Sequence, residues 1–106
     1  MTPFPFSILT PAGALLNGNV VFVGVRSIEG ALGVLAKHAP MVAACPPGVV
    51  RVQQEDGWKF FATSDVILSA DGHKVVALAG RAEEAKDEAA ALRAVQLWQE
   101  QEAAAK

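Results

Sequence analysis

The side chains best suited to acid–base or nucleophilic chemistry here are two histidines, His38 and His73, the single thiol Cys45, and the step Ser64-Asp65. A catalytic triad or a Cys/His pair needs nucleophile, base and orienting group within hydrogen-bond reach. His38 and Cys45 are seven residues apart across a proline, and an extended path would separate them by up to about 23 Å. No nucleophile-elbow glycines surround Ser64. The sequence predicts no catalytic residues.

Metal and cofactor motifs are also missing from the sequence. There is no Cys-x-x-Cys or His-x-x-x-His spacing, and Gly30-Ala31-Leu32-Gly33 is neither a dinucleotide fingerprint nor a P-loop. A single cysteine allows no internal disulfide, which fits a reducing, cytosolic compartment. We therefore expect no metal and no cofactor.

Charge and hydropathy exclude further classes of function. The net charge is −2 with a pI near 5.6, which leaves no basic footprint for nucleic acid. No basic leader opens the chain, and no apolar run approaches the roughly 20 residues that span a bilayer. Hydrophobic residues make up 52% of the chain, enough for one folded core. We expect no nucleic-acid binding and no membrane insertion.

The segment from Glu29 to Pro40 has two glycines, one histidine and one proline in twelve residues. Glycines at 30 and 33 favour a backbone that bends or takes positive φ, and His38-Ala39-Pro40 stops a regular element. We expect an irregular surface loop in which His38 serves contact rather than catalysis.

Short runs of β-branched and aromatic residues predict strands up to about Ala79. The first is Phe6–Leu9, ended by a turn at Thr10-Pro11-Ala12-Gly13. Asn17-Gly18 predicts another turn, followed by the longest strand, Val20–Ile28. Met41–Cys45 is a further short run.

Asp-Gly steps predict two hairpins in the second half of this region. One joins Val49–Gln53 to Trp58–Thr63 through Asp56-Gly57. The other joins Val66–Leu68 to His73–Ala79 through Asp71-Gly72. Seven or eight such strands bury their apolar faces by forming an all-β sandwich, a flattened barrel of short antiparallel strands.

The last part of the chain, from Glu83 to Lys106, has the pattern of one C-terminal α-helix. Its acidic start complements the helix dipole, and Ala91, Val95 and Trp98 form a modest apolar stripe with Leu92 beside it. We expect Leu92, Val95 and Trp98 to dock on the sandwich or on a partner. The expected domains are a β-sandwich over 1–80 and a helical segment over 81–106.

Adjacent Phe60 and Phe61 point to opposite faces of a strand, so both cannot enter one core. Together with a mean hydropathy of +0.30, this predicts an outer apolar patch, which favours an interaction module over an enzyme.

The order of several motifs resembles the epsilon subunit of the F-type ATP synthase. The motifs are Thr10-Pro11-x-Gly13, Glu29-Gly30-x-x-Gly33-x-Leu35-x-x-His38-Ala39-Pro40, Pro47-Gly48, and Val76-x-Leu78-Ala79 before an Ala/Glu-rich helix. The resemblance covers nearly the whole chain. It departs from the family where members carry the nucleotide signature Asp-x-x-Arg-Ala, because Asp87 and Arg93-Ala94 are too far apart.

This resemblance implies a sandwich of about ten strands at the foot of the central stalk of a proton-translocating rotary ATP synthase. The implied partners are the gamma subunit, the rotor (c) ring and the alpha/beta catalytic hexamer. The implied role is non-catalytic: coupling of rotation to ATP synthesis and, through the helical region, modulation of ATP hydrolysis. The implied location is peripheral, on the cytoplasmic side of the bacterial inner membrane.

In the same resemblance, the rotor-ring contact comprises Glu29, Gly30, Gly33 and His38. The alternative interpretation is a free-standing β-sandwich module that binds a small ligand or a peptide. A small hydrolase using His38 or His73 is the least favoured hypothesis.

Overall fold

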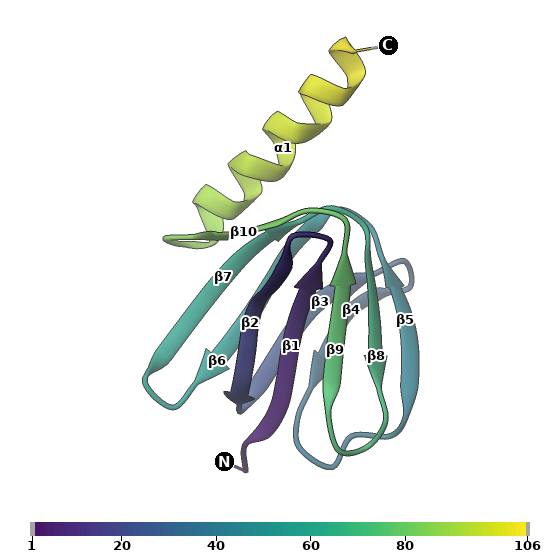
Figure 1. Cartoon of the computed structure of the whole chain (residues 1–106), viewed down its shortest axis with the longest axis vertical. Coiled ribbons are helices and arrows are strands. Elements are labelled where there is room, and N and C mark those ends of the chain that lie inside the picture. The colour runs from purple at the N-terminus through teal and green to yellow at the C-terminus, as the bar shows by residue number, and fades with distance from the viewer. Residues whose placement is uncertain (1, 106) are drawn as a thin grey trace.

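The computed structural model describes residues 2–105 as a β-sandwich followed by one helix (Figure 1). In chain order, the elements are β1 Phe4–Thr10, β2 Gly13–Val20, β3 Phe22–Ser27, β4 Gly30–Val34, β5 Met41–Cys45, β6 Gly48–Gln54, β7 Gly57–Thr63, β8 Val66–Ala70, β9 Val75–Ala79, β10 Ala82–Ala85 and α1 Glu88–Ala104. The sandwich with a single C-terminal helix is the predicted fold class.

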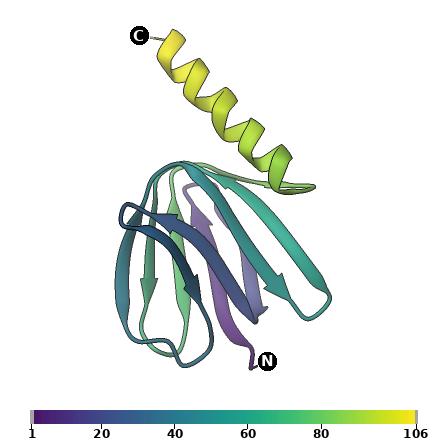
Figure 2. The same cartoon turned by 180° about the vertical axis from the view of Figure 1, so that it is seen from behind.

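Two five-stranded sheets face each other across the core (Figures 1 and 2). Sheet I has the strand order β2-β1-β9-β8-β5, and sheet II has the order β10-β7-β6-β3-β4. All neighbouring pairs are antiparallel except β1 and β9, which run parallel. Alternation along the strands points one set of apolar side chains inward.

The core between the sheets is built from these inward side chains. Phe6, Ile8 and Leu68 enter it from sheet I, and Val52 and Phe61 enter it from sheet II, each no more than 1% exposed. Phe60 lies on the opposite face and packs against α1, as the adjacency of the two phenylalanines predicts. The two Asp-Gly hairpins are confirmed, with positive φ at Gly57 and Gly72.

The N-terminal half differs from the sequence prediction in two places. The predicted turn at Asn17-Gly18 lies inside β2, where Gly18 pairs with Phe6 and Asn17 Oδ1 accepts a hydrogen bond from Ser7. The predicted strand Val20–Ile28 is broken at Val21, where the chain passes from sheet I to sheet II. A strand that changes sheets bends at the corner, which a continuous apolar pattern does not reveal.

The expectation of a loop over Glu29–Pro40 is wrong in its middle. Gly30–Val34 is strand β4, which pairs with β3 from Ser27↔Gly30 to Val23↔Val34. Gly30 does take positive φ, at +126°, where the hairpin turns. The turn through residues 35–40 then leads to β5.

The C-terminal helix begins later than predicted. The segment after Glu83 first completes β10, whose Ala82–Ala85 pairs with the edge of β7 and so lies with the sandwich. Asp87 then caps α1, because its Oδ1 accepts a 2.7 Å hydrogen bond from Ala90 N. From this start the helix rises off one end of the sandwich (Figures 1 and 2).

Candidate interaction surfaces

The four residues predicted to form one contact do not gather in one place. Glu29 lies in the turn between β3 and β4, Gly30 is the first residue of β4, and Gly33 lies within β4. His38 follows β4, and the five-residue strand alone separates it from Gly30 by about 16 Å. The β3–β4 turn and the β4–β5 turn lie at opposite ends of the sandwich (Figure 1).

The turn at Glu29 is an exposed tip that is held by hydrogen bonds. Ser27 Oγ accepts a hydrogen bond from Glu29 N and donates one to the Gly30 carbonyl, at 3.1 and 3.0 Å. Ile28 N donates to the Ala44 carbonyl at 3.1 Å, which attaches the tip to the end of β5. Ile28 and Val42 are each 74% exposed beside the Glu29 carboxylate. This tip presents two apolar side chains and one acid to solvent.

His38 is held as a packing residue at the opposite end. Its Nδ1 donates to the Leu35 carbonyl at 2.9 Å, and its ring meets Phe4 edge-on with centroids 5.6 Å apart. Nε2 is buried and has no hydrogen-bond partner among the described residues. No substrate reaches such a nitrogen, so the geometry supports neither acid–base chemistry nor a metal ligand at this histidine.

The remaining chemistry-bearing groups are also occupied structurally. Ser64 Oγ accepts a hydrogen bond from Arg81 N at 2.9 Å. This bond links the β7–β8 connection to the β9–β10 connection. Cys45 is 5% exposed, and burial raises the pKa of its thiol. Within residues 2–105 no three His, Cys, Asp or Glu side chains are grouped to hold a metal ion.

The outer face of sheet I carries an apolar stripe that was not assigned from the sequence. Leu9, Leu78 and Ile67 pair directly across β1, β9 and β8, and each is between 36% and 49% exposed. Val42 lies one row away on β5. None of the five strands of sheet I contains a charged residue. The five segments that form sheet I can be seen in the sequence to lack charged residues, and this pattern could have indicated the uncharged face.

The outer face of sheet II is different, because α1 covers part of it. Ala91 and Val95 are buried against Ala62, and Trp98 packs at the edge of the same cluster. The Arg81 guanidinium lies 4.1 Å from the centre of the Trp98 ring. Leu92 remains 46% exposed. Of the residues predicted to dock, Val95 and Trp98 therefore touch the sandwich most closely.

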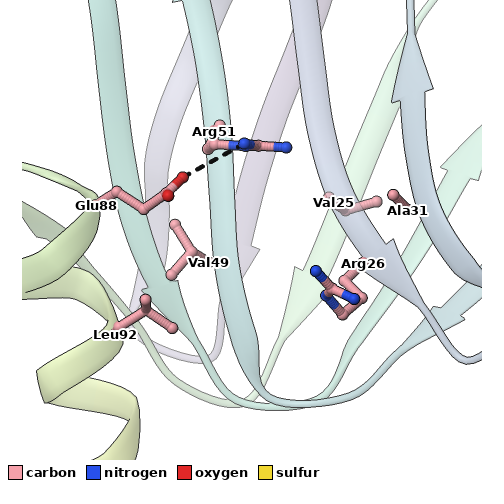
Figure 3. Close-up of a pocket in the computed structure, with 7 residues that line it drawn as sticks. All are labelled: Val25, Arg26, Ala31, Val49, Arg51, Glu88 and Leu92. Carbon is pink, nitrogen blue, oxygen red and sulfur yellow. Dashed lines mark hydrogen bonds and ion pairs between the residues drawn. The ribbon is translucent and has the colours of Figure 1, made fainter.

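Leu92 lines a hollow of about 160 Å³ between α1 and strands β6, β3 and β4 of sheet II (Figure 3). Arg51 donates to Glu88 Oε1 across this hollow at 3.4 Å, with both side chains about half exposed. Arg26 and Ala31 form its other wall. The hollow combines apolar walls with two cations and one carboxylate.

Among residues 2–105, the helix is not long and apolar enough to cross a membrane.

Comparisons with known proteins agree on one family. The family model for the ATP synthase delta/epsilon chain, β-sandwich domain, matches residues 3–85. The ATP synthase epsilon chain of Desulforudis audaxviator is 35% identical over 77 residues, covering 73% of this chain and 56% of that protein. The ATP synthase epsilon chain of Alkalilimnicola ehrlichii is 36% identical over 97 residues, covering 89% and 69%. The aligned part of the chain thus spans 56% and 69% of the length of these two relatives.

Solved structures show the same fold at lower identity. A chain of the Euglena gracilis mitochondrial ATP synthase OSCP/F1/c-ring structure aligns with a TM-score of 0.75 and 20% identity, covering 100% of this chain and 83% of that one. A chain of the Tetrahymena thermophila mitochondrial ATP synthase central stalk and c-ring aligns with a TM-score of 0.67 and 12% identity, covering 77% and 66%.

Proposed function

This chain belongs to the ATP synthase delta/epsilon family, and from that premise we propose that it is a non-catalytic central-stalk subunit of a proton-translocating rotary ATP synthase. In this proposal it couples rotation of the rotor ring to ATP synthesis through contacts with the gamma subunit and the ring. It works as a peripheral part of the complex on the cytoplasmic side of the bacterial inner membrane.

The observation that carries the proposal is the charge-free outer face of sheet I. Its stripe of Leu9, Leu78 and Ile67 is apolar and built on paired strands, so its backbone is fixed in the absence of a partner. The outer face of sheet II, by contrast, has Arg26, Arg51 and a helix. We assign the gamma subunit to the sheet I face.

Two substitutions test this assignment. Leu78→Asp and Ile67→Asp place a carboxylate at the centre of the stripe, and desolvating it on docking should weaken gamma binding at least about tenfold. Both side chains are nearly half exposed, so the sandwich should still fold, which circular dichroism checks. Leu97→Asp on α1, where Leu97 is 51% exposed, is the matched control and should leave the affinity unchanged. Unchanged gamma binding by both sheet I variants would remove this assignment.

We assign the rotor ring to the tip at Ile28, Glu29 and Gly30, which sits at the opposite end from His38. Gly33 and His38, predicted for the same contact, support the strand and the turn that follow the tip. Glu29→Lys should lower ATP-driven proton pumping in reconstituted membranes while ATP hydrolysis continues. Glu55→Lys, on the exposed turn between β6 and β7, is the control. Pumping that stays fully coupled in Glu29→Lys would contradict this contact.

In this proposal, α1 contacts the alpha/beta hexamer and modulates ATP hydrolysis. Every described residue beyond Trp98 is exposed, so this half is open to a partner. Replacing Gln99 and Gln101 by Asp should change the rate of ATP hydrolysis by the assembled complex. An unchanged rate would confine the role of the chain to gamma and the ring.

A further inference from the structure

The outer face of sheet I carries a second row of side chains beside its apolar stripe. Two residues along each strand from the stripe lie Ser7, Val76 and Ser69, which pair directly across β1, β9 and β8. Asn17, on the edge strand β2, pairs with Ser7 and continues the row. Because a strand rises about 3.3 Å per residue, this row runs about 7 Å from the stripe. The face thus offers apolar groups along one line and hydroxyl and amide groups along a parallel line.

One pair in this second row is fixed by a hydrogen bond. Ser7 Oγ donates to Asn17 Oδ1 at 2.9 Å, at the surface of the sandwich. Since this bond uses Oδ1, it sets the orientation of the amide and leaves the two N–H donors of Nδ2 for an acceptor outside the pair. The Asn17 side chain is exposed, so that acceptor is water or a partner.

The bond between Ser7 and Asn17 matters more for binding than for folding. At the surface its net contribution to the free energy of unfolding is small, because water competes for both groups. In an interface from which a partner excludes water, that competition ends, and a buried donor without an acceptor becomes costly. An amide that is already held in one orientation also loses less conformational entropy on binding.

The surroundings of Asn17 favour an uncharged acceptor. None of the five strands of sheet I contains a charged residue. A carboxylate or ammonium group docked on this face would therefore lose its hydration without gaining a counter-charge. A neutral carbonyl oxygen avoids that cost and accepts directly from Nδ2.

We propose that Asn17 is a specificity-determining residue of the gamma contact and that Ser7 is its positioning residue. Ser7 holds the amide so that Nδ2 donates to an uncharged carbonyl of the gamma subunit, from its main chain or from an Asn or Gln side chain. The apolar stripe packs beside this bond. A surface with an apolar group or a cation opposite Asn17 leaves the amide unpaired and is rejected. This inference rests on the assignment of gamma to the sheet I face.

The test measures binding of purified gamma subunit to the purified full chain by isothermal titration calorimetry. Asn17→Ala removes the donors and should weaken binding about fivefold. Asn17→Asp keeps the shape but replaces the donors with a carboxylate oxygen, so it should weaken binding at least as much. Ser7→Ala should weaken binding about threefold in the wild-type chain and have no effect in the Asn17→Ala background, because Ser7 acts through Asn17.

Asn19→Ala is the matched control. Asn19 is an exposed amide on the same strand, two residues further from the stripe, and its loss should leave the affinity unchanged. Wild-type affinity in both Asn17 variants would overturn the proposal, and so would an equal loss from Ser7→Ala in both backgrounds.

Leu78→Asp, measured in the same titration, separates the two ways of failing. If Leu78→Asp weakens binding while both Asn17 variants bind like wild type, gamma docks on sheet I without using the amide, and only this inference falls. If all three variants bind like wild type, the assignment of gamma to sheet I falls with it.

Discussion

At the scale of single residues, the groups best suited to chemistry are used to hold the backbone. His38 bonds the Leu35 carbonyl, Ser64 bonds Arg81 N, and Cys45 is a buried apolar side chain. Their residue types alone allowed a catalytic interpretation. Their positions in the sequence, however, do not have the spacing of a known catalytic motif. That missing spacing is visible in the sequence. The sequence could not predict what each residue binds, because those partners come from distant strands and turns.

Asp71 gives a pH-dependent prediction. Backbone N–H groups of Lys74 and His73 bond its carboxylate at 2.9 and 2.8 Å and hold its pKa below the ordinary value. A folded-state pKa below the unfolded one contributes stability that is complete above about pH 5, one unit above the unfolded pKa, and is lost as the pH falls through the folded-state pKa. Asp71→Asn keeps an acceptor but removes the charge. The gap in melting temperature between wild type and this variant should therefore narrow as the pH falls from about 5 through the folded-state pKa of Asp71.

A difference in melting temperature that stays the same at every pH would contradict this interpretation of Asp71. Asp65→Asn is the control, since Asp65 is an exposed aspartate on another turn of the sandwich.

Gly33 gives a second residue-scale prediction, which concerns space rather than charge. Gly33→Val should push the Phe22 ring off the sheet, because even a Cβ would lie 2.9 Å from Cε1 of that ring. The expected cost is about 1 kcal/mol in the free energy of unfolding, with a change in Trp58 fluorescence. In a Phe22→Ala background the same substitution should cost less, and a double-mutant cycle measures the difference. Equal costs in both backgrounds would show that the ring is not the obstacle.

At the scale of elements, the two Asp-Gly hairpins were predictable, whereas strand β4 and the crossing between the sheets at Val21 were not. Asp56-Gly57 and Asp71-Gly72 determine their hairpins locally, through residues that accept positive φ. β4 was missed because two glycines and a following proline look like loop chemistry. The strand forms because its backbone groups pair with β3, a tertiary condition that outweighs local propensity.

The start of α1 illustrates the same limit. The acidic residues after Arg81 suit a helix N-terminus, but the free edge of β7 pairs with 82–85 first. Asp87 then provides the cap. The docking stripe of Ala91, Val95 and Trp98 was predictable, because its spacing is a property of the helix alone.

The contact between Arg81 and Trp98 should set how firmly α1 is held. Arg81 lies over the Trp98 ring and is also paired with Glu83 at 3.1 Å, so its guanidinium is positioned from two sides. A half-exposed cation–π contact stabilises by about 0.5–1 kcal/mol. Arg81→Ala should therefore increase amide hydrogen exchange two- to fivefold in the second half of α1. Arg93→Ala, which removes an exposed arginine of α1, is the matched control, and equal exchange in the two variants would leave the contact without a role.

At the scale of the whole molecule, the two sheets have different outer faces on a shared core. Sheet I has a charge-free face with an apolar stripe, and sheet II has arginines, the packed aromatic rings of Phe22 and Trp58, and a helix. Composition predicted a surplus of apolar surface but could not locate it, because which runs become neighbours depends on topology. The parallel pairing of β1 and β9 brings Leu9 beside Leu78, which are far apart in sequence.

The sandwich and α1 form separate apolar clusters, which predicts that they are separable in stability. The cluster between the sheets contains no residue of α1, and the helix contributes Ala91 and Val95 to a second, small cluster. Val95→Asp buries a carboxylate in that second cluster, which costs about 2–4 kcal/mol and should detach the helix. The sandwich should keep its cooperative melting transition within about 4 °C of wild type, while helical circular dichroism falls.

Val52→Asp, in the core between the sheets, is the matched comparison and should abolish that transition. If Val95→Asp unfolds the sandwich as well, then the expected division near residue 80 does not describe how this chain folds, and the helix belongs to the same cooperative unit as the strands.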